Sequence, residues 1–170
     1  MEAYETNRKP PTLYQDLSGL GGWLVLVQIG LYLTILMLLI QLFNETIPTI
    51  QSEEWELLTT KGAEYYDPLW QPLLTFEMTA NALMLLLCGY CLYNLYRRKA
   101  ILPKLMITFY AANLVVILID YALLNQIALV KELELMTTDD IRDIIRTIIT
   151  CAVWIPYFLR SERVKNTFIN

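Results

Sequence analysis

The sequence has 170 residues, enough for one domain, and 56% of them are hydrophobic, with a mean hydropathy of +0.42. This composition lies above the range of soluble globular domains and indicates a membrane protein. The chain contains no histidine, which excludes imidazole-based catalysis, the common zinc sites and histidine-based pH sensing. The three cysteines, Cys88, Cys91 and Cys151, all lie in apolar stretches, which excludes a disulfide-rich secreted scaffold.

Residues 1–18 are polar and predict a short arm ahead of the first membrane span. The next stretch, Leu20–Phe43, has 24 residues and no charge. At about 1.5 Å per residue it is slightly longer than a hydrocarbon core of about 30 Å, so it predicts a transmembrane helix. A cleaved signal peptide is the alternative, but the run is too long for one and lacks a small-residue cleavage motif.

Residues 44–70 form an acidic connection, in which Lys61 is the only base. Trp55 and the leucines that follow it suggest a short helix lying on the membrane surface, with Ser52 as its N-cap and Gly62 as its stop. A solvated acidic loop with a few anchoring aromatic rings is the plainer interpretation.

Asp67 followed by Pro68 is typical of a helix start, and a second span is predicted from about Pro72 to Tyr96. A tight basic turn comes next, at residues 97–104. The third predicted span is Leu105–Leu124, which is interrupted only by Asp120.

Residues 125–140 form a second acidic connection, and Thr137–Asp140 is a capping signal for a last helix. That helix, Ile141–Leu159, is long enough to cross a bilayer but carries Arg142, Asp143 and Arg146 in its first turns. A charge deep in hydrocarbon costs about 2.5–3.5 kcal/mol on insertion scales. We therefore expect these charges to contact other helices or to reach the interface.

The distribution of bases predicts the orientation. Nine of the thirteen Lys and Arg residues lie in the arm, the turn at 97–104 and the tail, whereas the two acidic connections hold only Lys61 and Lys131. The positive-inside rule then places both termini in the cytoplasm. The predicted fold is an all-α, membrane-embedded antiparallel bundle of four transmembrane helices over residues 19–160, with outer loops at 44–70 and 125–140 and a cytoplasmic tail at 161–170.

Polar side chains inside the spans form the main candidate site. Counted from the helix ends, Glu77, Asp120 and Arg146 lie at similar depth near the outer side, and we expect Arg146, together with Arg142, to pair with the two carboxylates. The candidate polar cluster or ligand site consists of Glu77, Asn81, Asn113, Asp120, Arg142 and Arg146. Ion pairs that hold the helices in register are the structural interpretation, and a cavity that binds a small polar ligand or a proton is the functional one.

Cys88-Gly-Tyr-Cys91 has the spacing of a redox dithiol. The predicted topology places the pair toward the reducing cytoplasmic side, and neither outer loop has a cysteine for exchange. Buried apolar thiols are therefore the favoured interpretation. No metal site and no cofactor are predicted.

The C-terminal tail is the second candidate, because its aromatic and basic side chains share one helical face. The candidate interaction residues are Trp154, Tyr157, Arg160, Arg163, Lys165 and Phe168. A basic stop-transfer end is the plain interpretation of this segment, and a docking surface for a cytoplasmic partner protein is the more specific one.

Two motifs together resemble a known family. Gly19-Leu-Gly-Gly-Trp-Leu24 and the segment from Trp154 to Phe168, which reads Trp-Ile-Pro-Tyr-Phe-Leu-Arg-Ser-Glu-Arg-Val-Lys-Asn-Thr-Phe, are similar to the bacterial inner-membrane family catalogued as domain of unknown function 2569. The resemblance implies four transmembrane helices in a bacterial cytoplasmic membrane, and it implies no reaction, cofactor or substrate. Because glycine allows close approach of backbones, we expect the first motif to contact the second.

The favoured function is a non-enzymatic membrane protein that binds either a partner protein, through the tail or the outer loops, or a small ligand at the polar cluster. The alternative is a small proton-coupled transporter that works as a homo-oligomer and uses Glu77 or Asp120. A membrane-embedded enzyme is third, because the chain has no recognisable nucleophile and base pair. Apart from the lipid bilayer no partner is specified, and nothing indicates nucleic acid.

Overall fold

The computed structural model describes residues 18–132 and 138–169, and every regular element within these ranges is a helix. The predicted arm, up to residue 17, and Thr137 of the predicted capping signal lie outside the described residues. Four helices are long: α1 (Trp23–Gln41), α4 (Trp70–Tyr96), α5 (Leu102–Leu124) and α7 (Thr138–Arg160). The shorter ones are η1 (Leu42–Thr46), α2 (Ile47–Ile50), α3 (Glu53–Thr59), α6 (Ala128–Glu132) and α8 (Glu162–Thr167).

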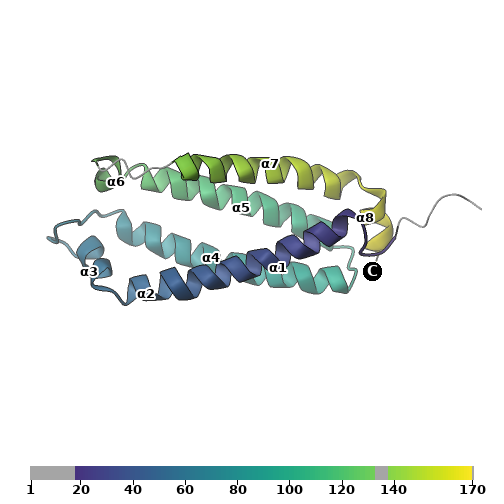
Figure 1. Ribbon diagram of the computed structural model, residues 1–170, viewed down its shortest axis with the longest axis horizontal. Coiled ribbons are helices and arrows are strands. Elements are labelled where there is room, and N and C mark those ends of the chain that lie inside the picture. Colours follow the sequence, from purple (N-terminus) through teal and green to yellow (C-terminus); the bar gives the residue numbers. More distant parts are fainter. Residues whose placement is uncertain (1–17, 133–137, 170) are drawn as a thin grey trace, which may run out of the picture.

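The long helices lie side by side in an elongated molecule (Figure 1). α5 packs along both α4 and α7, and α1 crosses over α4. Three helical segments in the described part of the chain are long and apolar enough to cross a membrane, namely Trp23–Ile50, Trp70–Tyr96 and Leu102–Leu124. The described part of the chain is therefore all-helical, and the protein is a membrane-spanning protein. α7 is as long as α5, but its charged first turns keep it outside this group.

The first helical segment is longer than the sequence predicts. Helical backbone continues past Phe43 through the π-helical turn η1 and through α2, and the chain leaves the helix only at Gln51. Asn44 and Glu45, which mark the predicted loop, are thus part of the helix. The predicted surface helix is present as α3, but the Ser52 hydroxyl at its N-cap position donates to the Thr49 carbonyl, 2.8 Å away, and does not cap the helix.

The start of α4 also serves as a junction between the two acidic connections. The helix begins at Trp70, and one carboxylate oxygen of Asp67 accepts a hydrogen bond from the Leu69 N–H at 2.9 Å. The other oxygen accepts from the Ala128 N–H of α6 at 3.4 Å. Below this junction Leu73, Ile127 and Val130 form a small buried cluster that holds α6 against α4.

The main core lies among α1, α4, α5, α7 and α8. Leu24, Leu31, Cys88, Cys91 and Met106 are almost completely buried in it, and the Cys88 thiol donates to the Leu31 carbonyl at 3.4 Å. All three cysteines are free thiols. Large apolar side chains also cover the outside of the long helices: Leu86, for example, is 70% exposed. Such a continuous apolar surface fits contact with lipid.

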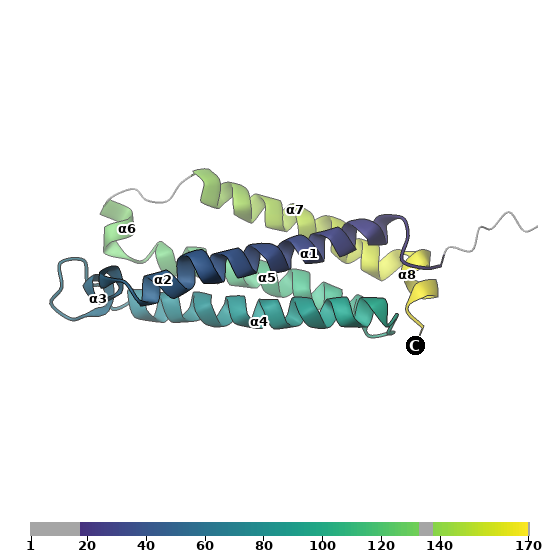
Figure 2. The same ribbon diagram turned by 60° about the horizontal axis from the view of Figure 1, so that its bottom comes forward.

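The two ends of the molecule carry opposite charge. The basic end contains the start of α1, the turn between α4 and α5, and α8, whereas the acidic end contains α2, α3 and α6 (Figure 2). The described bases of the first end are Arg97, Arg98, Lys99, Lys104, Arg160, Arg163 and Lys165. The acids of the second end include Glu45, Glu53, Glu54, Glu56, Glu64 and Asp67.

Candidate functional site

Two carboxyl groups meet between α4 and α5 near the acidic end. Glu77 and Asp120 are both half-buried, and their carboxyl groups are near enough to interact electrostatically. The Oδ1 atom of Asp120 is buried and has no hydrogen-bond partner among the described residues. Two neighbouring ionised carboxylates repel each other, and a proton or another cation beside them relieves this repulsion. The pair is therefore a place where positive charge is stabilised.

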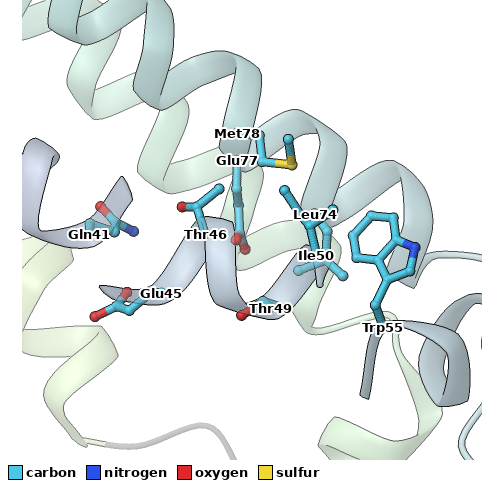
Figure 3. A pocket seen from close by; sticks show the side chains of 9 residues that line it. All are labelled: Gln41, Glu45, Thr46, Thr49, Ile50, Trp55, Leu74, Glu77 and Met78. Atoms are coloured by element: carbon cyan, nitrogen blue, oxygen red, sulfur yellow. The ribbon is translucent and has the colours of Figure 1, made fainter. Parts of the chain in front are cut away.

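A cavity of about 180 Å³ opens beside Glu77, between the end of the first helical segment and α4. Glu77 extends from α4 toward the turns of η1 and α2 that carry Thr46 and Thr49 (Figure 3). The other lining residues are Gln41, Glu45, Ile50, Trp55, Leu74 and Met78. The cavity thus combines two carboxylates, two hydroxyls and an amide with an apolar wall and one indole ring.

The π-helical turn places two of these groups. η1 carries Glu45 and Thr46, and the five-residue turn of a π-helix shifts the side chains that follow it relative to those of an α-helix. Such turns occur often at functional sites. Trp55 of α3 reaches the cavity from the other side, so the short surface helix forms part of the site.

Asp120 also borders a second, smaller cavity of about 150 Å³ between α5 and α7. Asp140 and Asp143 of α7 line it. Carboxylates from η1, α4, α5 and α7 therefore surround this part of the acidic end, and together they favour cations over anions. Among the described residues, no three His, Cys, Asp or Glu side chains are grouped so as to hold a metal ion.

Arg146, which was predicted to pair with these carboxyl groups, does not do so. Within the described part of the chain Arg146 forms no salt bridge with Glu77 or Asp120; it faces a separate groove between α1 and α7. The predicted pairing of Arg146 with the carboxylates is not observed, because counting residues from a helix end gives the depth of a side chain but not the direction in which it points. Arg142 is exposed on α7, Asn81 is half-buried on α4, and Asn113 is exposed on α5.

Sequence reasoning missed Gln41, Glu45 and Thr46. We ended the first span where its uncharged run ends, at Phe43, and so placed Glu45 in a loop. The spacing of four residues between Gln41 and Glu45 is the signal that could have found them, because it puts both side chains on one face if the helix continues.

The C-terminal tail packs on the protein itself. The Thr167 hydroxyl accepts a hydrogen bond from the Gly19 N–H at 2.9 Å and lies 3.3 Å from the Gly19 carbonyl oxygen, to which it can donate. An Arg163 guanidinium nitrogen donates to the Ser18 carbonyl at 3.4 Å, and a side chain at Gly22 would meet the same guanidinium. The predicted contact between the glycine motif and the tail motif is therefore confirmed.

Burial divides the candidate tail residues. Phe168 is 5% exposed, Trp154, Tyr157 and Arg163 are half-buried, and Arg160 and Lys165 are exposed. Trp154 also packs edge-to-face on Trp23, with ring centroids 6.2 Å apart. Most of the face that would serve for docking is therefore engaged within the chain.

The model of one protein family, described as "Protein of unknown function (DUF2569)", matches residues 17–169. No curated protein and no solved structure shows significant similarity to the chain.

Proposed function

Because the chain belongs to the DUF2569 family, whose description names no activity, we propose a function from the geometry alone. We propose that the protein is a non-enzymatic membrane protein that binds a small organic cation at its acidic end. The observation that carries the proposal is the proximity of two half-buried carboxyl groups, those of Glu77 and Asp120, with Glu77 lining the 180 Å³ cavity. A bound ammonium group would supply the positive charge that two adjacent carboxylates lack.

The lining of the cavity supports an organic cation more than a bare ion. Trp55 presents an indole ring, which attracts ammonium groups through its π-face, and Ile50, Leu74 and Met78 add apolar surface. The volume is below the range of about 300–1,000 Å³ typical of drug-sized ligands, which favours a short amine. The absence of histidine and of a recognisable nucleophile with its base supports binding without chemistry.

The proposal includes an antiparallel bundle of four transmembrane helices, with α7 as the fourth span. Its length equals that of α5, it packs along α5, and its charges are concentrated in the turns nearest the acidic end. The basic end would face the cytoplasm under the positive-inside rule, so the cation site would open toward the outer side. A bacterial cytoplasmic membrane is the location that fits this proposal.

Thermal unfolding of the detergent-solubilised protein tests the site. Methylammonium, tetramethylammonium and putrescine are added at constant ionic strength against sodium chloride. A ligand at a hundred times its dissociation constant stabilises the folded state by about 2.7 kcal/mol, which is readily measured. We expect stabilisation of the wild type by at least one of the amines.

Glu77→Gln and Asp120→Asn should each abolish that stabilisation. Glu54→Gln is the matched control, because Glu54 is an exposed carboxylate of α3 that does not line the cavity. Stabilisation that persists in both site variants, or no stabilisation by any amine, would refute the proposal.

Proton-coupled transport is the second candidate, and the same carboxyl pair favours it, because such a pair can hold one proton. A four-helix chain rarely encloses a pathway, so this function requires a homo-oligomer. Amine-driven proton movement in proteoliposomes, lost in Glu77→Gln, would establish transport. Binding of the amine without proton movement would refute transport and support the binding function.

A further inference from the structure

A third cavity, of about 460 Å³, lies between α1 and α7 and is distinct from the cation site. Phe109 and Tyr110 of α5 form its floor. Both views show α1 and α7 close together at the basic end and apart toward the acidic end (Figures 1 and 2). We call this cavity the lateral groove. Its volume lies within the range of about 300–1,000 Å³ typical of small-molecule sites.

The walls of the lateral groove are largely apolar and continue onto the lipid-facing surface. Leu33 and Met37 of α1 line it and are 53% and 63% exposed. A ligand could therefore enter sideways from the bilayer. Gly30 leaves room in the same wall, since a Cβ atom added there would meet nothing within 4 Å.

Arg146 is the one charged residue among the described residues that line the groove, and it lies at the end nearer the acidic end of the molecule. The Thr34 and Thr150 hydroxyls also line the groove, but they already donate to the carbonyls of Gly30 and Arg146, at 2.9 and 2.8 Å. The remaining side-chain donors of the lining are the Arg146 guanidinium, the Gln41 amide, the Tyr110 hydroxyl and the Trp154 indole N–H. In the described part of the chain no carboxylate forms a salt bridge with Arg146. A positive charge at this depth in a membrane protein favours an anionic partner.

We propose that the lateral groove binds an anionic single-chain amphiphile of the fatty-acid type, with its carboxylate on Arg146 and its alkyl chain directed toward Trp154. Eight residues of α7 separate Arg146 from Trp154, which is about 12 Å along the helix axis, so the groove extends far enough for a chain. A guanidinium binds a carboxylate through two parallel hydrogen bonds. Because the groove has one anchoring charge and one elongated apolar channel, it favours a ligand with one acyl chain over a ligand with two.

Quenching of tryptophan fluorescence tests the assignment, because Trp154 lines the groove. Stearate brominated in mid-chain is titrated into the protein in nanodiscs of zwitterionic lipid. The wild type should show saturable quenching, and Trp154→Phe should lose most of the quenched signal. The methyl ester of the same acid, which has no charge, should bind at least about tenfold more weakly.

Two pairs of variants locate the site. Arg146→Gln should weaken binding by about tenfold or more, whereas Arg142→Gln, on the same helix but outside the groove lining, should not. Gly30→Leu fills the groove and should abolish quenching, whereas Gly89→Leu, a helical glycine of α4 that also has open space beside it, should leave it unchanged.

Several outcomes would overturn the proposal. Equal binding of the acid and its methyl ester would show that the Arg146 charge does not hold the ligand. Equal effects of Gly30→Leu and Gly89→Leu would show that the ligand does not bind in the lateral groove. Tighter binding of brominated phosphatidylglycerol than of brominated stearate would show that a two-chain lipid is the occupant.

Discussion

Replacing Thr167 by valine should release the C-terminal tail from the start of α1. The side chain is 3% exposed, and its hydroxyl is within hydrogen-bonding distance of both the N–H and the carbonyl of Gly19, at 2.9 and 3.3 Å. Valine keeps the shape but removes both hydrogen bonds. Each intramolecular hydrogen bond contributes about 1 kcal/mol net, so Thr167→Val should lower the free energy of unfolding by about 2 kcal/mol.

The half-buried position of Gly19 limits this loss, because water can reach its freed groups in part. Thr34→Val is the matched control. The Thr34 hydroxyl donates only within its own helix, to Gly30, through an exposed hydrogen bond, so its removal should change stability by no more than about 0.5 kcal/mol.

Unfolding by sodium dodecyl sulfate, followed by the fluorescence of the packed Trp23 and Trp154 rings, measures the difference in stability. Trypsin cleavage after the half-buried Arg163 separates local release of the tail from global unfolding. Thr167→Val should accelerate that cleavage well before the transition. Equal unfolding midpoints and equal cleavage rates for Thr167→Val and Thr34→Val would contradict the assigned role of the Thr167 hydroxyl.

Two further predictions follow from the backbone and the topology. Gly22 has φ +63° and ψ −136°, a combination suited to glycine, and it lies against Arg163. In the same unfolding assay Gly22→Ala should therefore lower the free energy of unfolding by about 1–3 kcal/mol, whereas Gly30→Ala should be neutral or stabilising. The reverse order would refute the argument that Gly22 permits the close approach of Arg163. In a cysteine-free background, Lys61→Cys and Lys131→Cys should react with an impermeant maleimide in intact cells. Lys104→Cys and Lys165→Cys should react only after permeabilisation. Reaction of Lys131→Cys and Lys165→Cys from the same side would exclude α7 as a span.

Hydropathy predicted the positions of the long helices because burying backbone in lipid requires long uninterrupted helices, whatever else the sequence encodes. The boundaries were less accurate where polar residues continue a helix. The first segment extends to Ile50 because Asn44 and Glu45 lie in a π-helical turn, and a rule based on apolar runs stops at such residues.

The sequence placed Glu77 and Asp120 at a common depth, and the structure brings them together. It placed Arg146 at that depth too, but Arg146 lines the groove between α1 and α7. Depth follows from counting residues along a helix, whereas direction depends on how the helix rotates against its neighbours. The contact between the glycine motif and the tail was predictable because both segments were expected at the same end of the helix bundle.

The two ends of the molecule are held together differently, and this difference bears on both sites. At the basic end, Trp23 packs on Trp154 and Thr167 bonds to Gly19, so α1, α7 and α8 are fastened to one another. Toward the acidic end α1 and α7 separate. The cation cavity lies there, and the lateral groove extends from there to Trp154, with Gln41 lining both.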